Sequence, residues 1–127
     1  MNEATVHIVA GDAMLELFRE RYPELEAIPF REDLSKGSCE WREPCKEMIE
    51  KRAAFWGVTP KEYKEKLAPI IDLDVSRRIV LNFGEDDCCR ANLKFMTGLL
   101  KARGYSRPIL VRIVNEYDLT LFREYFA

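Results

Sequence analysis

Ile79-Val80-Leu81-Asn82-Phe83-Gly84 is the stretch that decides the fold, because a short apolar run ended by a glycine is typical of a strand buried inside a sheet. Apolar residues at helical spacing follow it between residues 91 and 100, and Gly104 supplies a stop signal. A buried strand that leads into an amphipathic helix predicts one unit of a parallel α/β sheet.

The beginning of the chain repeats this pattern. Residues 6–10 form an apolar run that ends at Gly11, and apolar residues recur at helical spacing over 14–22, before Pro23. Residues 27–30 predict a second strand, at a sheet edge because Pro29 lacks an N–H donor.

The end of the chain predicts one more strand and one more helix. Residues 108–114 form a fourth apolar run, and the apolar spacing of residues 119–125 predicts a short closing helix. The segment 34–74, between the second and third strands, is too helical to be a loop. It predicts one helix with an apolar face over 45–56 and a second that starts at the capping box of residues 59–62 and ends near Pro69.

These elements predict a single α/β domain over residues 1–127, with a helical excursion over about 34–74. We expect a three-layer sandwich with a short, mainly parallel four-stranded sheet in the order 2-1-3-4, of a Rossmann-like or flavodoxin-like type.

The composition narrows the class of protein. The 127 residues are 47% hydrophobic, and 20 basic against 22 acidic residues give a net charge of −2, which leaves nucleic-acid binding unsupported. No apolar run approaches the roughly 20 residues that span a bilayer, and residues 1–3 lack the basic n-region and the long apolar h-region typical of a signal peptide. We therefore expect a cytoplasmic protein without a membrane partner, whose four cysteines are reduced thiols.

The candidate site lies where strand order reverses, because ligands of open parallel sheets bind at the carboxyl ends of the strands. The loops that end there are polar and acidic. The residues expected to bind a ligand are Gly11, Asp12, Arg31, Glu32, Asp33, Ser35, Arg52 and Glu85. Asp12, Asp86 or Asp87, and Asn115 also stand where helix N-caps belong, and capping is the simpler role for each.

A dinucleotide fingerprint is absent, since residues 9–14 supply only Gly11 where the motif needs three glycines. Asp12 would also place a negative charge at a helix N-terminus, which suits a hydroxyl, an amine or a metal ion better than a phosphate. In dinucleotide-binding folds an acidic residue about 20 residues after the glycines holds a ribose hydroxyl, and Glu32 and Asp33 follow Gly11 at about this spacing. A nucleoside-like ligand therefore remains an alternative.

Four other residues have competing roles. Arg52 shares a helix face with apolar residues, so it must find a carboxylate, extend to solvent or face the site. His7, the only histidine, is expected to be a satisfied core residue rather than a base. Cys88 or Cys89, at a helix N-terminus, is the one nucleophile to consider, because such a position can lower a thiol pKa.

Four short motifs, in order, resemble a known family. They are residues 7–12, 30–37, 52–56 and 83–93, and together they resemble the bacterial domain-of-unknown-function family numbered eighteen thirty-five. The resemblance implies an uncharacterised compact α/β domain, often followed by further sequence in longer relatives. The family pattern points to Gly11, Asp12, Arg31, Glu32, Leu34, Ser35, Gly37, Arg52, Glu85 and Asn92.

Three hypotheses for function follow. The first is a module that binds a small polar or nucleoside-like molecule at the strand ends, with no cofactor required. The second is a Mg²⁺-assisted phosphoryl or phosphodiester hydrolase, with Asp12, Arg52 and Glu85 as catalytic candidates and Asp12, Asp33 and Asp86 as metal ligands. The third is a protein–protein interaction domain, with homo-oligomers possible, that pairs through an exposed edge strand at 109–114.

Overall fold

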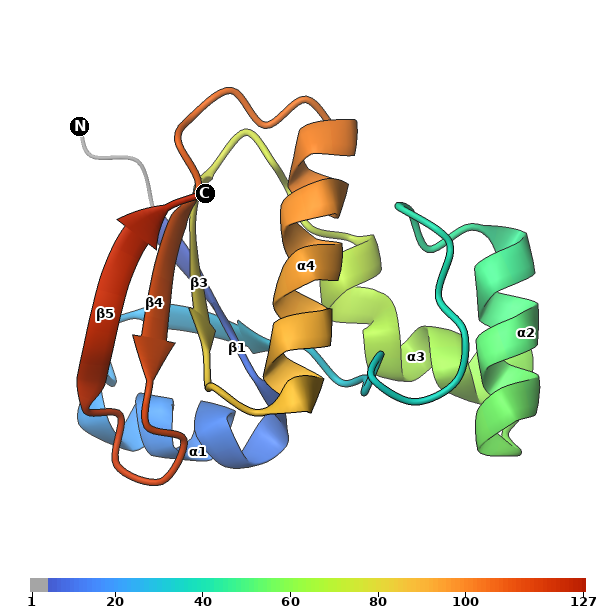
Figure 1. Cartoon of the computed structure of the whole chain (residues 1–127), viewed down its shortest axis with the longest axis horizontal. Helices are drawn as coiled ribbons and strands as arrows, with labels where there is room; N and C mark the ends of the chain where they lie inside the picture. Colours follow the sequence, from blue (N-terminus) through green and yellow to red (C-terminus); the bar gives the residue numbers. More distant parts are fainter. Residues whose placement is uncertain (1–4) are drawn as a thin grey trace.

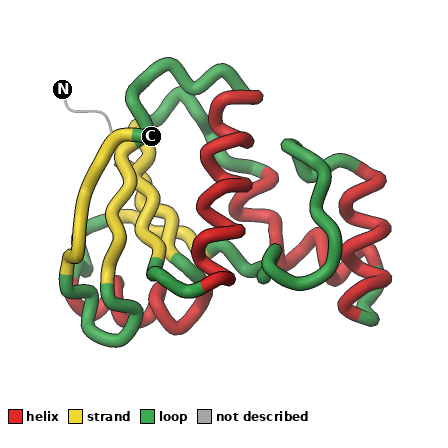
Figure 2. The backbone as a smooth tube through the Cα atoms, in the orientation of Figure 1, coloured by secondary structure: helices red, strands yellow, loops and turns green. Residues whose placement is uncertain are grey.

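The computed structural model describes residues 5–127 (Figure 1). In that range the chain forms five strands and four helices, which alternate through most of the sequence (Figure 2). The strands are β1 (Thr5–Val9), β2 (Glu26–Pro29), β3 (Arg78–Phe83), β4 (Leu110–Val114) and β5 (Leu121–Phe126). The helices are α1 (Gly11–Arg21), α2 (Lys46–Trp56), α3 (Pro60–Ile71) and α4 (Asp87–Ala102).

The expectation of a four-stranded, mainly parallel sheet is met only in part. The sheet has five strands in the order β2-β1-β3-β4-β5, so the full order differs from 2-1-3-4 by one added strand beyond β4. The first four strands run parallel and β5 pairs antiparallel with β4, which makes the sheet mixed. Pro29 does lie in an edge strand, as its missing N–H donor predicts.

The closing helix expected over 119–125 is wrong, because these residues form most of β5. Asn115 is not a helix cap; its side-chain oxygen accepts from the backbone N–H groups of Tyr117 and Asp118 and so closes a turn. Leu119 ends that turn with a positive φ of 62°. The aromatic residues beyond it favour a strand, and pairing with β4 satisfies their backbone groups.

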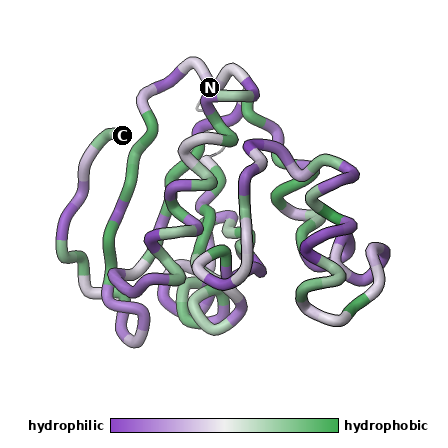
Figure 3. The backbone as a smooth tube through the Cα atoms, turned by 45° about the vertical axis from the view of Figure 1, so that its right-hand side comes forward, coloured by the Kyte–Doolittle hydropathy of each residue, from purple (hydrophilic) through white to green (hydrophobic). Residues whose placement is uncertain are grey.

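This hairpin also corrects the expected edge strand. Residues 109–114 are not exposed at an edge, since β4 lies between β3 and β5. The free edge belongs to β5, where Phe122 and Phe126 are among the exposed apolar side chains. Figure 3 shows hydrophobic and hydrophilic positions mixed along this last strand, which ends at the C label.

Helices cover both faces of the sheet. Val6 and Ile8 of β1 point to one face, where they pack in the larger apolar cluster with α3 and α4. Val9 points to the other face, where it packs with Met14 and Phe18 of α1. Because a side chain alternates between faces along a strand, both faces of the central strands are buried, which explains their unbroken apolar runs.

The helical segment between β2 and β3 is confirmed as α2 and α3. Thr59 caps α3 by accepting from the N–H of Glu62, as the capping box predicts. Helix α3 continues past the expected end, with Pro69 inside it, and stops at Ile71. Helix α2 packs against α3 and is the helix most distant from the sheet in Figure 1.

Candidate functional site

A cavity of about 240 Å³ lies at the carboxyl ends of β1 and β3, where the order of the strands reverses. We call it the strand-end cleft. In Figure 1 the first turns of α1 and α4 lie at this edge of the sheet. Its lining residues are Ala10, Gly11, Asp12, Phe30, Arg31, Glu32, Asp86, Cys88, Cys89, Asn92 and Glu116. Of the predicted ligand-binding residues, Gly11, Asp12, Arg31 and Glu32 lie here.

Asp12 and Arg31 form the exposed pair of the cleft. Arg31 donates from Nε to Asp12 Oδ1 at 2.8 Å, and this is the only hydrogen bond of the Arg31 side chain within residues 5–127. Its two terminal nitrogens therefore keep their donors for solvent or a ligand. Asp12 does not cap α1, because Ala10 is the N-cap and no side chain in the described part of the chain caps that end.

Asp86, Cys89 and Glu116 form a second group. Asp86 is the N-cap of α4 and accepts from the N–H of Cys89 at 2.7 Å. This hydrogen bond lowers the pKa of Asp86, whereas a hydrogen bond to Asp86 raises the pKa of Glu116. One ligand atom from each of the three side chains lies within 4.8 Å of the others. Asp86 thus caps a helix, as expected, and also lies at the cleft.

The surroundings of the vicinal cysteines do not favour a nucleophile. Burial raises the pKa of Cys88 and of Cys89 to about 12, so both are neutral thiols at pH 7. The electrostatic benefit of a helix N-terminus is outweighed, because Asp33 and Asp86 add negative charge beside Cys88. All four cysteines have free thiols.

Arg52 does not face the cleft, which corrects its prediction as a ligand-binding or catalytic residue. Its side chain is 1% exposed, and all five of its N–H donors are used. Nε and Nη2 bind the two carboxylate oxygens of Glu32 at 2.9 Å. The remaining donors bind the backbone carbonyl groups of Asp33, Lys36 and Ser38.

Glu32 is equally saturated. Besides Arg52, its carboxylate accepts from Trp56 Nε1, from the hydroxyl of Tyr63 and from the N–H of Asp33. Burial acts to raise the pKa of Glu32, but hydrogen bonds from Arg52 and Tyr63 outweigh it, and the pKa lies below its usual value. Burial and the same carboxylate raise the pKa of Tyr63. We call this set the Arg52–Glu32 network.

The Arg52–Glu32 network builds the loop after β2 rather than a ligand site. Asn92 of α4 joins it, accepting from the N–H of Leu34 and donating to the carbonyl of Glu32. Gly37 has a positive φ of 73°, and a Cβ there would lie 2.7 Å from Arg52 Nη1. These contacts give a structural reason for the arginine, the glutamate and the glycine of the motifs.

The remaining predicted residues also lie elsewhere. Ser35 donates to Asp33 from its backbone and its hydroxyl, so the two residues close a local turn and neither lines the cleft. Asp33 is therefore not placed with Asp12 and Asp86 as a metal ligand. Glu85 is exposed, accepts from Arg123 at 3.5 Å and is not a lining residue either.

A smaller cavity of about 190 Å³ adjoins the cleft, because both are lined by Arg31 and Glu32. We call it the Trp56 cavity. The other residues that line it are Asp33, Trp56, Val58, Tyr63 and Lys66. The sequence places Trp56 only on the apolar face of the helix expected over 45–56 and does not single out Tyr63 or Lys66, because nothing in the local pattern links α2 and α3 to the loop after β2.

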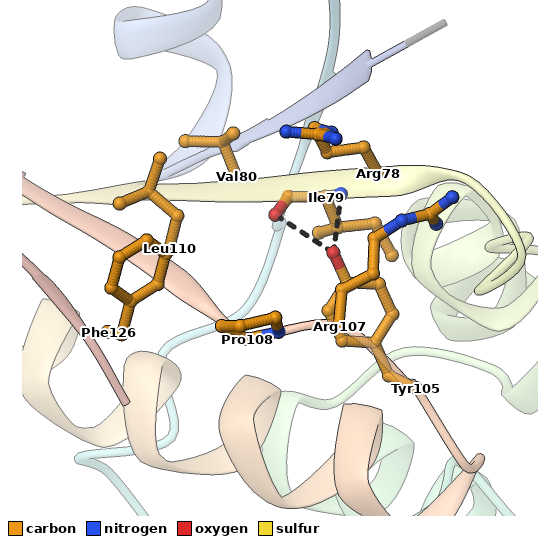
Figure 4. Close-up of a pocket in the computed structure, with 8 residues that line it drawn as sticks. All are labelled: Arg78, Ile79, Val80, Tyr105, Arg107, Pro108, Leu110 and Phe126. Atoms are coloured by element: carbon orange, nitrogen blue, oxygen red, sulfur yellow. Dashed lines mark hydrogen bonds between the residues drawn. The ribbon is translucent and has the colours of Figure 1, made fainter. Parts of the chain in front are cut away.

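Two further cavities lie away from the strand ends that carry the candidate residues. One, of about 590 Å³, lies between α4 and the segment around Trp41. Another, of about 280 Å³, lies at the opposite ends of the strands, where β3 and β4 begin (Figure 4). There the hydroxyl of Tyr105 contacts both backbone groups of Ile79, which commits this polar atom to the fold.

Comparison with known proteins gives no relative: no family model, no curated protein and no solved structure matches this chain. The family resemblance and the Rossmann-like classification therefore stay predictions. No helix within residues 5–127 is both long and apolar enough to cross a bilayer.

Proposed function

We propose that this protein binds a small polar, nucleoside-like ligand in the strand-end cleft. The proposal rests on hydrogen-bonding groups of the cleft that the fold leaves unused. Arg31 keeps two terminal nitrogens free beside an α1 N-terminus that no side chain of residues 5–127 caps, at the edge where ligands of parallel sheets bind.

The polar groups of the cleft define the chemistry of this ligand. The carboxylates of Asp12 and Asp86 accept hydrogen bonds, which suits sugar hydroxyl or amino groups. Glu116 also lines the cleft, and its hydrogen bond with Asp86 raises its pKa above the ordinary value. The unused donors of Arg31 suit an anionic or carbonyl oxygen. A molecule with several hydroxyl groups and one anionic group uses both kinds of partner.

The test is a thermal-shift titration with nucleosides, nucleoside monophosphates and sugar phosphates. A ligand at 100 times its dissociation constant adds about 2.7 kcal/mol to the free energy of unfolding, which is readily measured. The shift should disappear in Arg31→Gln. It should persist in Arg77→Gln, a matched control, because Arg77 also pairs with an exposed carboxylate, that of Glu26, but lies outside the cleft. Absence of any shift would overturn the proposal.

Metal-assisted hydrolysis is the second candidate, supported by the closeness of Asp86, Cys89 and Glu116. The thiol favours a softer ion such as Zn²⁺ over the Mg²⁺ expected from the sequence. The same titration with Mg²⁺, Mn²⁺ and Zn²⁺ separates the two candidates. A metal-dependent shift that Asp86→Asn abolishes would favour the hydrolase, and asparagine keeps the capping group.

A further inference from the structure

The Trp56 cavity contains a rigid aromatic surface. Trp56 is 41% exposed, yet its Nε1 donates to Glu32 at 2.8 Å, which fixes the orientation of the indole ring. The guanidinium carbon of Arg52 lies 5.7 Å from the centroid of this ring. The ring of Phe55 packs edge-on against it, with 4.9 Å between the two ring centroids. An exposed ring that is already ordered loses little conformational entropy when a planar group stacks on it.

Two cations border the same cavity. Lys66 of α3 is exposed and has no ion-pair partner among the described residues. Arg31 lines both this cavity and the cleft, with its terminal nitrogens free. Two carboxylates also line this cavity: that of Glu32 is paired with Arg52, and that of Asp33 accepts from Ser35 and keeps its negative charge. The hydrogen-bond donors that stay unused at the cavity are those of Arg31 and Lys66, beside the apolar ring of Trp56.

The two cavities share Arg31 and Glu32 in their linings, so one ligand can contact both. Their volumes, about 240 and 190 Å³, are each below the roughly 300–1,000 Å³ of ordinary ligand clefts, but together they fall in that range. Arg31 and Glu32 form the shared wall.

We propose that the Trp56 cavity is the ring subsite of the ligand site. The ligand class is a planar heteroaromatic ring joined to an anionic group, as in a nucleoside monophosphate. The ring stacks on Trp56, Arg31 binds the anionic group, and Lys66 adds positive charge. This inference rests on the proposed function, because Arg31 belongs to both cavities.

The experiment uses fluorescence, since Trp41 and Trp56 are the only tryptophans. Trp41→Phe leaves Trp56 as the single tryptophan, and Trp41 lines a different cavity. The probes are AMP, adenosine and ribose 5-phosphate. We expect AMP and adenosine to quench Trp56, and ribose 5-phosphate, which has no ring, to bind more weakly without quenching it.

Variants measure each contact by the dissociation constant of AMP. Trp56→Leu should weaken AMP binding roughly tenfold or more, as loss of a stacking partner does. Lys66→Gln should weaken AMP but not adenosine, which lacks the phosphate. Trp41→Leu and Lys64→Gln are the matched controls, because neither residue lines the Trp56 cavity, and both should leave the dissociation constant unchanged.

Each outcome decides between the two proposals. If AMP binds and Arg31→Gln abolishes binding, but Trp56→Leu and Lys66→Gln bind it as the wild type does, the ring subsite is overturned and the cleft stands. If none of the three probes binds, both proposals are overturned. Circular dichroism of Trp56→Leu checks its fold, and the exposed Lys66→Gln variant keeps the test decisive if Trp56→Leu does not fold.

Discussion

The Arg52–Glu32 network and the strand-end cleft are adjacent, and both are built from charged residues that the motifs contain. In the network every donor of Arg52 has a protein partner, and the side chains of Arg52 and Glu32 are each 1% exposed. In the cleft, Arg31 makes one hydrogen bond within residues 5–127 and Asp12 is 67% exposed. A charged residue in a motif is therefore a ligand-binding candidate only when the fold leaves it unused donors or acceptors.

The largest expected effect comes from breaking the network. Arg52→Ala should lower the free energy of unfolding by about 3–5 kcal/mol, because it leaves the buried carboxylate of Glu32 without its counter-charge. Urea denaturation of the variant and the wild type measures the difference. Arg31→Gln is the matched control, and an equally small loss in both variants would erase the distinction between the two regions.

The next prediction concerns the pH dependence of stability. It compares the network with the buried pair of His7 and Asn82, which has fewer hydrogen-bond partners. His7 is buried, and Asn82 lies 3.2 Å from its Nδ1, so the histidine is a satisfied core residue bound by a side chain. Burial, with the charge of Arg112, lowers the pKa of His7 from 6.5 to about 4. The folded state therefore binds fewer protons than the unfolded state, and stability falls as the pH drops from 6.5 to 4, by up to about 3 kcal/mol.

Glu32 should act only at lower pH. Its folded pKa is lowered, so its contribution is present above its ordinary pKa and is lost as the pH falls through the folded pKa. His7→Gln should therefore remove most of the stability loss between pH 6.5 and 4 and leave the loss at lower pH. A variant with the same pH profile as the wild type would show that His7 is not the group that titrates.

A glycine pair tests the shape of the network. Gly37→Ala should lower the free energy of unfolding by roughly 2–3 kcal/mol. The positive φ strains a residue with a side chain, and the added Cβ would lie 2.7 Å from Arg52 Nη1. Gly57→Ala should cost only about 1 kcal/mol, because Gly57 has a similar φ of 70° but open space around its Cβ. Thermal unfolding of both variants gives the difference, and equal losses would mean that the loop yields to the added methyl group.

Much of the fold could be predicted from the sequence, because the buried strands and the amphipathic helices have strong periodic patterns. The parallel strands, the helices between β2 and β3 and the edge position of Pro29 follow from local physics. Strand β5 could not be predicted in the same way. Its six residues are all exposed, so the spacing of its apolar residues does not mark a buried face. Their structure is determined by pairing with β4.

The candidate site could be predicted less well. Strand ends are marked in the sequence, and Gly11, Asp12 and Arg31, which the sequence places there, line the strand-end cleft. The partner of Arg52 could not be identified, since Glu32 lies 20 residues away in the chain and meets it only through tertiary packing. A charge on an apolar helix face indicates that a partner exists, but not which one.

The smallest expected effect on stability, and the largest on binding, belongs to the cleft. Asp12→Asn removes only an exposed ion pair and a charge in the first turn of α1, and Asp12 caps nothing, so stability should change by under about 1 kcal/mol. AMP affinity should nevertheless fall, because the free donors of Arg31 are oriented by this carboxylate. Calorimetric titration of Asp12→Asn, with Glu26→Gln as the control from an equivalent ion pair, measures both quantities. Unchanged AMP affinity in Asp12→Asn would mean that this carboxylate is an ordinary surface charge with no role in binding. Arg31 would then be the only member of the exposed ion pair that contributes to the ligand site.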